Sequence, residues 1–316
     1  MNHPVLSALV PVALLIAIGV FAGRRRWIGP ASVKDLANLV FLVLSPALLF
    51  RTMSTVDPRN VALQPLAAYF GAAFILFFGI LAVRGFHREA AVIGLAATFS
   101  NTFMIGVPLV SLAWGQAGLV QLFPLISVHA LVLLTMATLV LELAVQREAQ
   151  AAGGAPPRAL ARTVLQAVRN AVLHPVPLPI LAGLAFGQTG WTLPAVIDKP
   201  LQLLGQALGP VALLMVGVSL AQTSIGQQWK PALGVAALKT ALHPLLVLAI
   251  GWALGLSGVP FAVMVVAAAL PIGANVFLFS QRYGVAQDLV TASVGLSTLL
   301  AMATLSIALA FFGTGG

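Results

Sequence analysis

Two stretches of the sequence place polar and helix-breaking residues in the middle of apolar segments. They are Ser100, Asn101, Thr102, Gly106 and Pro108 within residues 95–115, and Pro271, Gly273 and Asn275 within residues 267–284. Proline removes a backbone hydrogen-bond donor and clashes with the preceding turn, and glycine weakens a helix further. We therefore predict an interrupted helix in each stretch, with Gly106, Pro108 and Pro271 marking the breaks.

A pair of interrupted helices could bind an anion. Freed backbone groups are tolerated within a membrane only where they face protein or a cavity, and the ends of half-helices offer positive dipole ends. The amides of Asn101 and Asn275 can each donate and accept hydrogen bonds. We predict a substrate site formed by Ser100, Asn101, Thr102, Pro271, Gly273 and Asn275. The alternative is a simple proline kink that neighbouring helices satisfy.

Three ionisable side chains also fall within apolar segments. Lys239 and His243 lie four residues apart, on one face of a predicted helix over residues 230–255, and His129 lies within residues 117–146. An ionisable residue inside a membrane marks a functional site by default, so Lys239 is a candidate to bind a carboxylate. His129 and His243 are candidates for proton coupling, because histidine titrates near neutral pH. The alternatives are a lysine that extends to the membrane surface and histidines that bond backbone carbonyls.

No other set of residues supports catalysis or metal binding. The sequence has no Cys, no GxxxxGK[ST] phosphate-binding loop, and no His, Asp and Glu cluster with the spacing of metal ligands. We expect no enzymatic activity, no cofactor, no metal and no direct use of ATP.

The composition requires that membrane helices position these residues. Only 16 basic and 7 acidic residues occur among 316, or 7%, whereas a soluble domain has about 25%. Hydrophobic residues make up 60% and the mean hydropathy is +1.05. The basic residues lie mostly between apolar runs, where lipid and insertion topology explain the net charge of +9 better than nucleic acid does. We therefore expect membrane lipid, and no nucleic acid, as a partner.

Apolar runs bounded by charges and turn residues predict ten membrane-spanning helices. They cover residues 4–23, 36–54, 62–83, 89–113, 117–146, 163–187, 194–222, 230–255, 259–281 and 286–312. Most basic residues follow odd-numbered spans, beginning with Arg24, Arg25 and Arg26. Because cytoplasmic loops carry the basic residues, we predict a multi-pass protein of the cell membrane with both termini outside the cytoplasm.

The two halves of the chain resemble each other at an offset of 164 residues. Identities include Pro11, Gly19, Gly23 and Pro46 in residues 1–146, and Pro175, Gly183, Gly187 and Pro210 in residues 163–316. Residues 147–162 are a predicted cytoplasmic linker between them. Because each half has five spans, the two copies must insert in opposite orientations, as in many secondary transporters. Chance similarity between apolar helices is the alternative.

The two interruptions resemble motifs of the auxin efflux carrier family. The segments that carry the resemblance are Asn101-Thr102-Phe103-Met104-Ile105-Gly106-Val107-Pro108-Leu109, and Ala269-Leu270-Pro271 followed by Phe277 and Phe279. The resemblance covers essentially the whole chain. It implies that helices 4 and 9 cross at their breaks, that spans 1, 2, 6 and 7 form a scaffold, and that spans 3–5 and 8–10 form a mobile transport domain. It also implies a homodimer with an elevator motion, and a place for His129 near the substrate.

The sequence departs from the plant members of that family. Those members have proline before the asparagine of the first motif, where this chain has Ser100, and an aspartate and a lysine where it has Val61-Ala62-Leu63-Gln64-Pro65. Auxin is therefore not the expected substrate. The short central loop is typical of bacterial members, a group associated with small carboxylates.

The residues thus predict a secondary transporter for a small organic anion of the carboxylate type. A sodium-coupled carrier resembling bile-acid symporters is the alternative, but it would have acidic sodium ligands near the breaks, and none of the seven acidic residues lies in either stretch. A channel would have a continuous polar lining, whereas the polar residues gather at the two breaks.

Overall fold

The computed structural model describes residues 4–57, 62–151, 176–223 and 226–312, together with Leu165 and Arg169. Throughout these residues the regular structure is helical, and seven segments are long and apolar enough to cross a membrane. The prediction of an all-α, multi-pass membrane protein is confirmed at this level. The linker beyond Ala151 lies outside the described residues, and so does the start of the sixth predicted span up to residue 175, apart from Leu165 and Arg169.

Both predicted interruptions are present in the backbone. In the first, α5 (Arg88–Thr98) ends, and a wide π-helical turn, η3 (Thr102–Gly106), leads into α6 (Val107–Ala151). In the second, α12 (Gly258–Ala269) ends, and α13 (Asn275–Tyr283) begins after an irregular segment. The last helix, α14 (Gln287–Phe312), follows α13 after a turn.

The fourth and fifth predicted spans are joined through a kink. Within α6, Gly115 has a φ of +58°, a conformation that favours glycine, and the helix changes direction there. The kink therefore lies between the residues of the fourth predicted span and the long helix of the fifth predicted span.

Two further spans contain a π-helical turn before a proline. The second predicted span consists of α2 (Pro30–Leu39), η1 (Val40–Leu44) and α3 (Ser45–Met53), and the eighth predicted span consists of α10 (Trp229–Ala237), η5 (Leu238–Leu242) and α11 (His243–Ala253). Pro46 and Pro244 stand second in α3 and α11. A proline clashes with the carbonyl four residues before it, and a wider turn relieves that clash.

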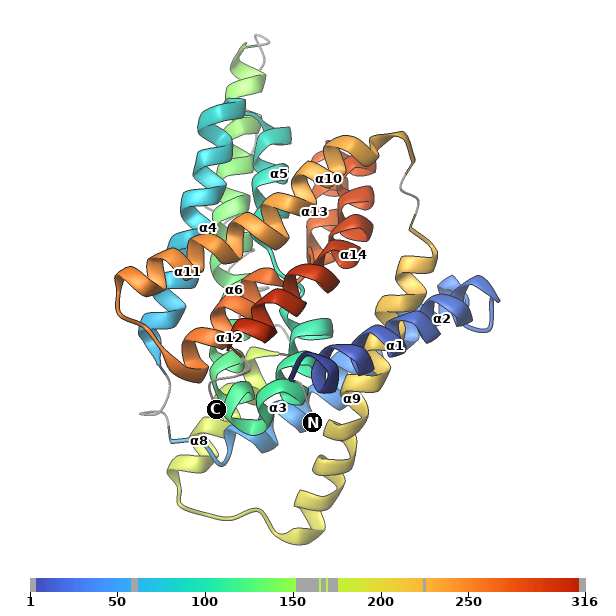
Figure 1. Ribbon diagram of the computed structural model, residues 1–316, viewed down its shortest axis with the longest axis vertical. Helices are drawn as coiled ribbons and strands as arrows, with labels where there is room; N and C mark the ends of the chain where they lie inside the picture. Colours follow the sequence, from blue (N-terminus) through green and yellow to red (C-terminus); the bar gives the residue numbers. More distant parts are fainter. Residues whose placement is uncertain are drawn as a thin grey trace.

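The helices lie in two groups. Figure 1 shows α1 (Pro4–Arg24), α2, α3, α8 (Pro177–Gln188) and α9 (Ala195–Ala221) in the lower part of the view. The upper part holds α4 (Leu63–Arg84), α5, α10, α11, α13 and α14, and α6 extends from one part into the other.

Close backbone contacts hold the lower group together. A Cβ atom on Gly19 of α1 would lie 2.2 Å from the Leu214 carbonyl oxygen of α9, and one on Gly217 would lie 2.1 Å from the Ile16 carbonyl oxygen. Likewise, a Cβ on Gly183 of α8 would lie 2.6 Å from the Phe50 carbonyl oxygen of α3. These glycines allow helix backbones to touch, as small residues do in membrane proteins.

Candidate functional site

The two helix interruptions pair with each other. Ser100 and Ile272 form an isolated antiparallel bridge. The backbone N–H of Asn101 donates to the Pro271 carbonyl at 2.8 Å, and that of Gly273 donates to the Phe99 carbonyl at 2.9 Å. An unpaired backbone group in a membrane costs several kcal/mol, so each break satisfies part of the other.

Glycines stand where the two breaks approach each other. A Cβ on Gly273 would lie 2.8 Å from Cδ1 of Phe99 and 3.2 Å from the Ser100 carbonyl oxygen. A Cβ on Gly106 would lie 2.8 Å from Cδ1 of Leu270. Gly106, a predicted break residue, and Gly273, a predicted site residue, therefore act through close packing as well as through flexibility.

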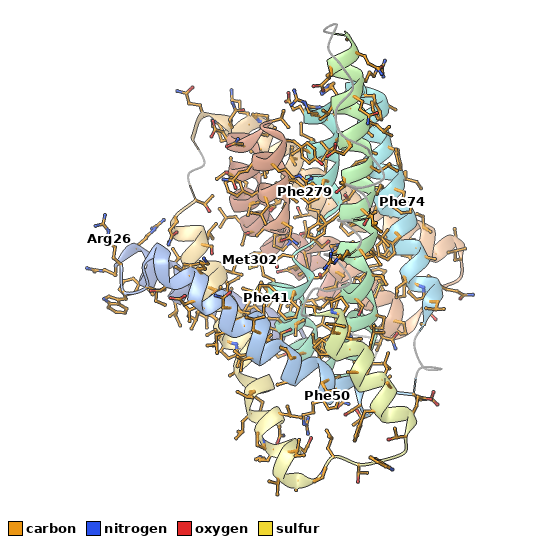
Figure 2. The ribbon with its side chains drawn as sticks, turned by 180° about the vertical axis from the view of Figure 1, so that it is seen from behind. Arg26, Phe41, Phe50, Phe74, Phe279 and Met302 are labelled. Carbon is orange, nitrogen blue, oxygen red and sulfur yellow. The ribbon has the colours of Figure 1, made fainter. Side chains whose placement is uncertain are left out.

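A cavity of about 470 Å³ opens beside the paired breaks. Its polar lining residues are Ser100, Asn101, Thr102, Ser127, His129, Thr138, Asn275 and Arg282. Phe41 of η1 and Phe279 of α13, both labelled in Figure 2, belong to its apolar wall, so both groups of helices contribute to the cavity. No acidic side chain lines it within the described residues.

The two predicted asparagines occupy helix starts that face the cavity. Asn101 caps η3, because its Oδ1 accepts a hydrogen bond of 3.2 Å from the Met104 N–H. This role leaves the amide Nδ2 of Asn101 to donate elsewhere. Asn275 is the first residue of α13. At these starts the N–H groups of Val276 and Phe277 donate to the Gly273 and Ala274 carbonyls, and that of Met104 donates to Asn101. What both starts offer an anion is therefore an asparagine amide and the positive end of a helix.

A buried polar cluster lies behind the first break. The Tyr69 hydroxyl is 2.8 Å from Ser100 Oγ and 3.0 Å from His129 Nε2. The Ser100 N–H donates to the same Nε2 at 3.4 Å. This nitrogen therefore accepts, and Tyr69 can donate to it while accepting from Ser100. The ring of His243 packs edge-on against Tyr69 at 5.0 Å between centroids.

Lys239 lies apart from the cavity. It is fully buried in η5, and its ammonium donates to the carbonyl oxygens of Ala268 and, at 2.8 Å, Leu270. These carbonyls belong to the end of α12, where a helix interruption leaves acceptors without partners and where a positive charge is favourable. Lys239 thus contacts the back of the second break instead of the cavity lining.

The other predicted site residues have structural contacts. Pro271 accepts the hydrogen bond from Asn101 through its carbonyl and is not among the residues that line the cavity. Pro108 lies in the first turn of α6, packed against Gly209 of α9. The neighbouring Ile272 N–H donates to Ser297 Oγ of α14 at 3.1 Å.

Tyr69, Ser297 and Arg282 belong to the site but are not among the predicted residues. Tyr69 lies in a span so uniformly apolar that no face of it can be singled out. A signal is available all the same, since the chain has only 2 Tyr and the hydroxyl of a buried tyrosine usually finds a partner. In the sequence Arg282 stands out only as a basic residue that sets orientation, although it follows Asn275 at helical spacing.

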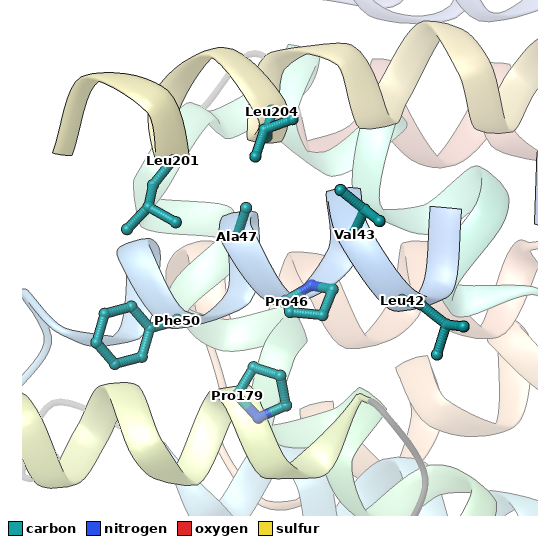
Figure 3. Close-up of a pocket in the computed structure, with 8 residues that line it drawn as sticks. All are labelled: Leu42, Val43, Pro46, Ala47, Phe50, Pro179, Leu201 and Leu204. Carbon is teal, nitrogen blue, oxygen red and sulfur yellow. The ribbon is translucent and has the colours of Figure 1, made fainter. Parts of the chain in front are cut away.

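A second cavity, of about 450 Å³, differs in character. It lies between η1, α3, α8 and α9, and Figure 3 shows its wall of Leu42, Val43, Pro46, Ala47, Phe50, Pro179, Leu201 and Leu204. All eight side chains are apolar, so this cavity offers an anion no side-chain donor. Among the described residues, no group of three or more His, Asp and Glu side chains could hold a metal ion.

Comparison with known proteins places the chain in a family. The sequence model of the family described as "Membrane transport protein" matches residues 4–309. The chain belongs to this family, the auxin efflux carrier family. It is therefore a membrane transporter, and the resemblance noted in the two break motifs is confirmed.

Three relatives of this member of the auxin efflux carrier family match it over most of its length. A "Putative malonate transporter" of Rhizobium meliloti (strain 1021) is 28% identical over 277 residues, which cover 85% of this chain and 83% of the relative. "Auxin efflux carrier component 8" of Arabidopsis thaliana is 24% identical, with 96% and 95% covered. "Uncharacterized transporter YfdV" of Escherichia coli (strain K12) is 28% identical, with 92% of each covered.

Proposed function

We propose that this transporter is a secondary carrier that binds a small organic anion of the carboxylate type in the cavity beside the paired breaks. The observation that carries this proposal is the lining itself. It combines Asn101, Asn275 and Arg282 with two helix starts, and it has no acidic side chain within the described residues. A lining of donors that contains no carboxylate of its own suits a carboxylate ligand. The relative named as a malonate transporter agrees with this substrate class.

We further propose that transport follows an elevator motion of two inverted five-helix repeats, with helices 4 and 9 crossing at their breaks. In this proposal α1, α2, α3, α8 and α9 are the scaffold, and the upper group in Figure 1 moves against it. The position of the cavity supports this assignment, since Phe41 comes from the lower group and Phe279 from the upper. A substrate held there would move with the breaks.

Proton coupling through His129 is part of the same proposal. Nε2 of His129 receives the Tyr69 and Ser100 contacts, so protonation of this nitrogen would replace an acceptor by a donor beside the first break. His243 lies in the same cluster but does not line the cavity. We expect His129→Gln to remove the dependence of uptake on a proton gradient more completely than His243→Gln does.

The lining of the cavity does not support the alternative of a sodium-coupled carrier. Sodium prefers oxygen ligands that include carboxylates, and the described cavity lining contains no carboxylate. At the break of α12, the ammonium of Lys239 already contacts the Ala268 and Leu270 carbonyls. We therefore propose a carrier that works without sodium.

The proposed homodimer, cell-membrane location and orientation rest on the family resemblance and the charge pattern. A chain without Cys is suited to labelling of single introduced cysteines. An impermeant thiol reagent applied to intact cells should label Gln188→Cys and should leave Ala151→Cys unlabelled. The reverse pattern would contradict the orientation.

The function is tested by thermal shift and by uptake into proteoliposomes. Purified protein is screened against mono- and dicarboxylates, with and without sodium, because a ligand that binds the folded state raises the melting temperature. Carboxylates that raise the melting temperature should also be transported, and Asn101→Ala should lose both effects. Asn38→Ala, an exposed asparagine on α2, is the matched control. The proposal fails if no carboxylate binds, or if Asn101→Ala behaves as wild type.

A further inference from the structure

One face of α13 lines the cavity from end to end. Asn275, Leu278, Phe279 and Arg282 all contribute to the lining, and their spacing of three, four and seven residues places them on one side of a helix. Asn275 stands at the break and Arg282 in the last turn. The cavity is thus polar at both ends of this face, and Leu278 and Phe279 lie between.

The guanidinium of Arg282 is available to a ligand. It forms an ion pair with Glu142, but Oε1 of Glu142 is 3.8 Å from Nη2, which is too long for a hydrogen bond. That same oxygen accepts a hydrogen bond of 3.0 Å from the Tyr283 hydroxyl. The guanidinium lies 5.4 Å from the centre of the Tyr283 ring, a contact that leaves its N–H donors free. Within the described chain it makes no hydrogen bond to another residue, and the Arg282 side chain is 55% exposed.

The neighbouring Arg88, in contrast to Arg282, is hydrogen-bonded to other residues of the protein. Its Nε donates to Glu148 Oε2 at 2.6 Å, and its Nη1 donates to the Tyr283 carbonyl at 3.2 Å. Arg88 therefore ties α5 to the end of α6 and to α13, and it does not line the cavity. Arg282 lines the cavity, whereas Arg88 connects the helices around it.

The length of α13 sets the spacing between the two polar ends. Seven residues of helix rise by about 10 Å, and helical side chains generally lean toward the N-terminus, which shortens the distance that a ligand between Arg282 and Asn275 must span. A ligand with a single carboxylate can satisfy one end only. A short ligand with two carboxylates can contact the asparagine amides with one group and pair with the guanidinium through the other.

We infer that Arg282 is a specificity-determining residue, which binds the second carboxylate of the substrate and makes the cavity selective for short dicarboxylates over monocarboxylates. The inference rests on the proposed function, because it takes the cavity as the substrate site. It adds a contact at the far end of α13 from the break motifs.

The test compares malonate with propionate, which also has three carbons but only one carboxylate. Binding of each is measured by calorimetry to purified wild type, Arg282→Gln and Arg282→Lys, with Arg84→Gln as a control. Arg84→Gln removes an exposed positive charge outside the cavity. We expect Arg282→Gln to weaken malonate binding by about 10–100-fold, on the scale of a charged hydrogen bond, and to leave propionate binding within about twofold. Arg282→Lys should retain part of the malonate affinity.

The outcomes separate this inference from the proposed function. The inference is overturned if Arg282→Gln weakens the binding of malonate and propionate equally, or weakens the binding of neither. In both cases the proposed function stands as long as the wild type binds these carboxylates. Asn101→Ala should weaken both ligands, which tests the function alone. If wild type binds neither malonate nor propionate nor the four-carbon pair succinate and butyrate, the function and the inference fail together. Melting temperatures without ligand check that each variant is folded.

Discussion

At the scale of single residues, Asn101 has two separable roles. Its Oδ1 caps η3 through the Met104 N–H, and its amide nitrogen remains available toward the cavity. Serine is also a good N-cap but lacks the amide donors. We predict that Asn101→Ser keeps the melting temperature of the wild type and loses about 1–3 kcal/mol of carboxylate binding.

Asn101→Ala should lose the cap as well, and its melting temperature should fall. Calorimetry and thermal denaturation of the two variants measure the roles independently. A double variant with Asn275→Ala should be non-additive for binding if both asparagines touch one ligand. Wild-type affinity in Asn101→Ser would show that the amide donors do not contact the substrate.

Lys239 supports the second break from behind. Its ammonium is the donor for the Ala268 and Leu270 carbonyls, which lie at the end of α12. We predict that Lys239→Met lowers the melting temperature, because buried carbonyls left without a donor cost about 1–3 kcal/mol. Lys230→Met is the matched control, since that lysine is exposed and lies over the ring of Trp229. Equal melting temperatures for the two variants would contradict this role.

A buried phenol links the end of α13 to α6. The Tyr283 hydroxyl donates to Glu142 Oε1 at 3.0 Å. Burial raises the pKa of Tyr283 above its ordinary value, and the Glu142 carboxylate raises it further although Arg282 opposes the shift. The phenol therefore stays protonated at neutral pH and donates to Glu142, whose ion pair with Arg282, at 3.8 Å, is longer than a hydrogen bond.

At the scale of elements, the pairing of the two breaks depends on Gly273. A methyl group there would meet Phe99 and the Ser100 carbonyl at distances that force one break to move. We predict that Gly273→Ala destabilises the protein by about 1–3 kcal/mol, which is typical of overpacking. Gly234→Ala is the control, because a Cβ atom there would have no described atom within 4 Å and α10 is helical at that position.

Thermal denaturation of the two glycine variants provides the measurement. Gly234→Ala should be neutral or stabilising, since alanine favours a helix by about 1 kcal/mol relative to glycine. If Gly273→Ala is as stable as Gly234→Ala, the breaks are not packed as closely as the structure has them.

The positions of both breaks can be predicted from the sequence, because proline, glycine and asparagine stand out within apolar runs. The contact between Ser100 and Ile272 cannot, since it joins segments far apart in the chain and depends on how the helices pack. The π-helical turns before Pro46 and Pro244 are not predictable either. An apolar run has no periodicity that distinguishes a π-turn from an α-turn, and the same uniformity conceals the inward faces of Tyr69 and Lys239.

At the scale of the whole molecule, the elevator proposal predicts that the two groups of helices move past each other. A cross-link between Phe41→Cys and Phe279→Cys would join η1 to α13 across the cavity, and it should stop uptake into proteoliposomes. Arg51→Cys with Asp198→Cys is the control pair. Arg51 and Asp198 form an ion pair of 2.7 Å within the lower group, so a cross-link there should leave uptake intact.

A reducing agent should restore uptake in the first pair if the link is a disulfide. Full transport by protein that is completely cross-linked between η1 and α13 would rule out relative motion at the cavity. Loss of transport in the control pair alone would assign the movement to the interface of α3 and α9 instead.

The exchange of hydrogen bonds between the two breaks has a consequence for biosynthesis. Asn101 leaves the ribosome long before Pro271 exists, so the first break enters the bilayer without the carbonyl that will accept its N–H. Until the second half is inserted, that stretch must be hydrated or shielded by the insertion machinery, because bare amides are not tolerated in lipid. An isolated first half should therefore be degraded in cells, whereas the two halves produced together as separate chains should protect each other.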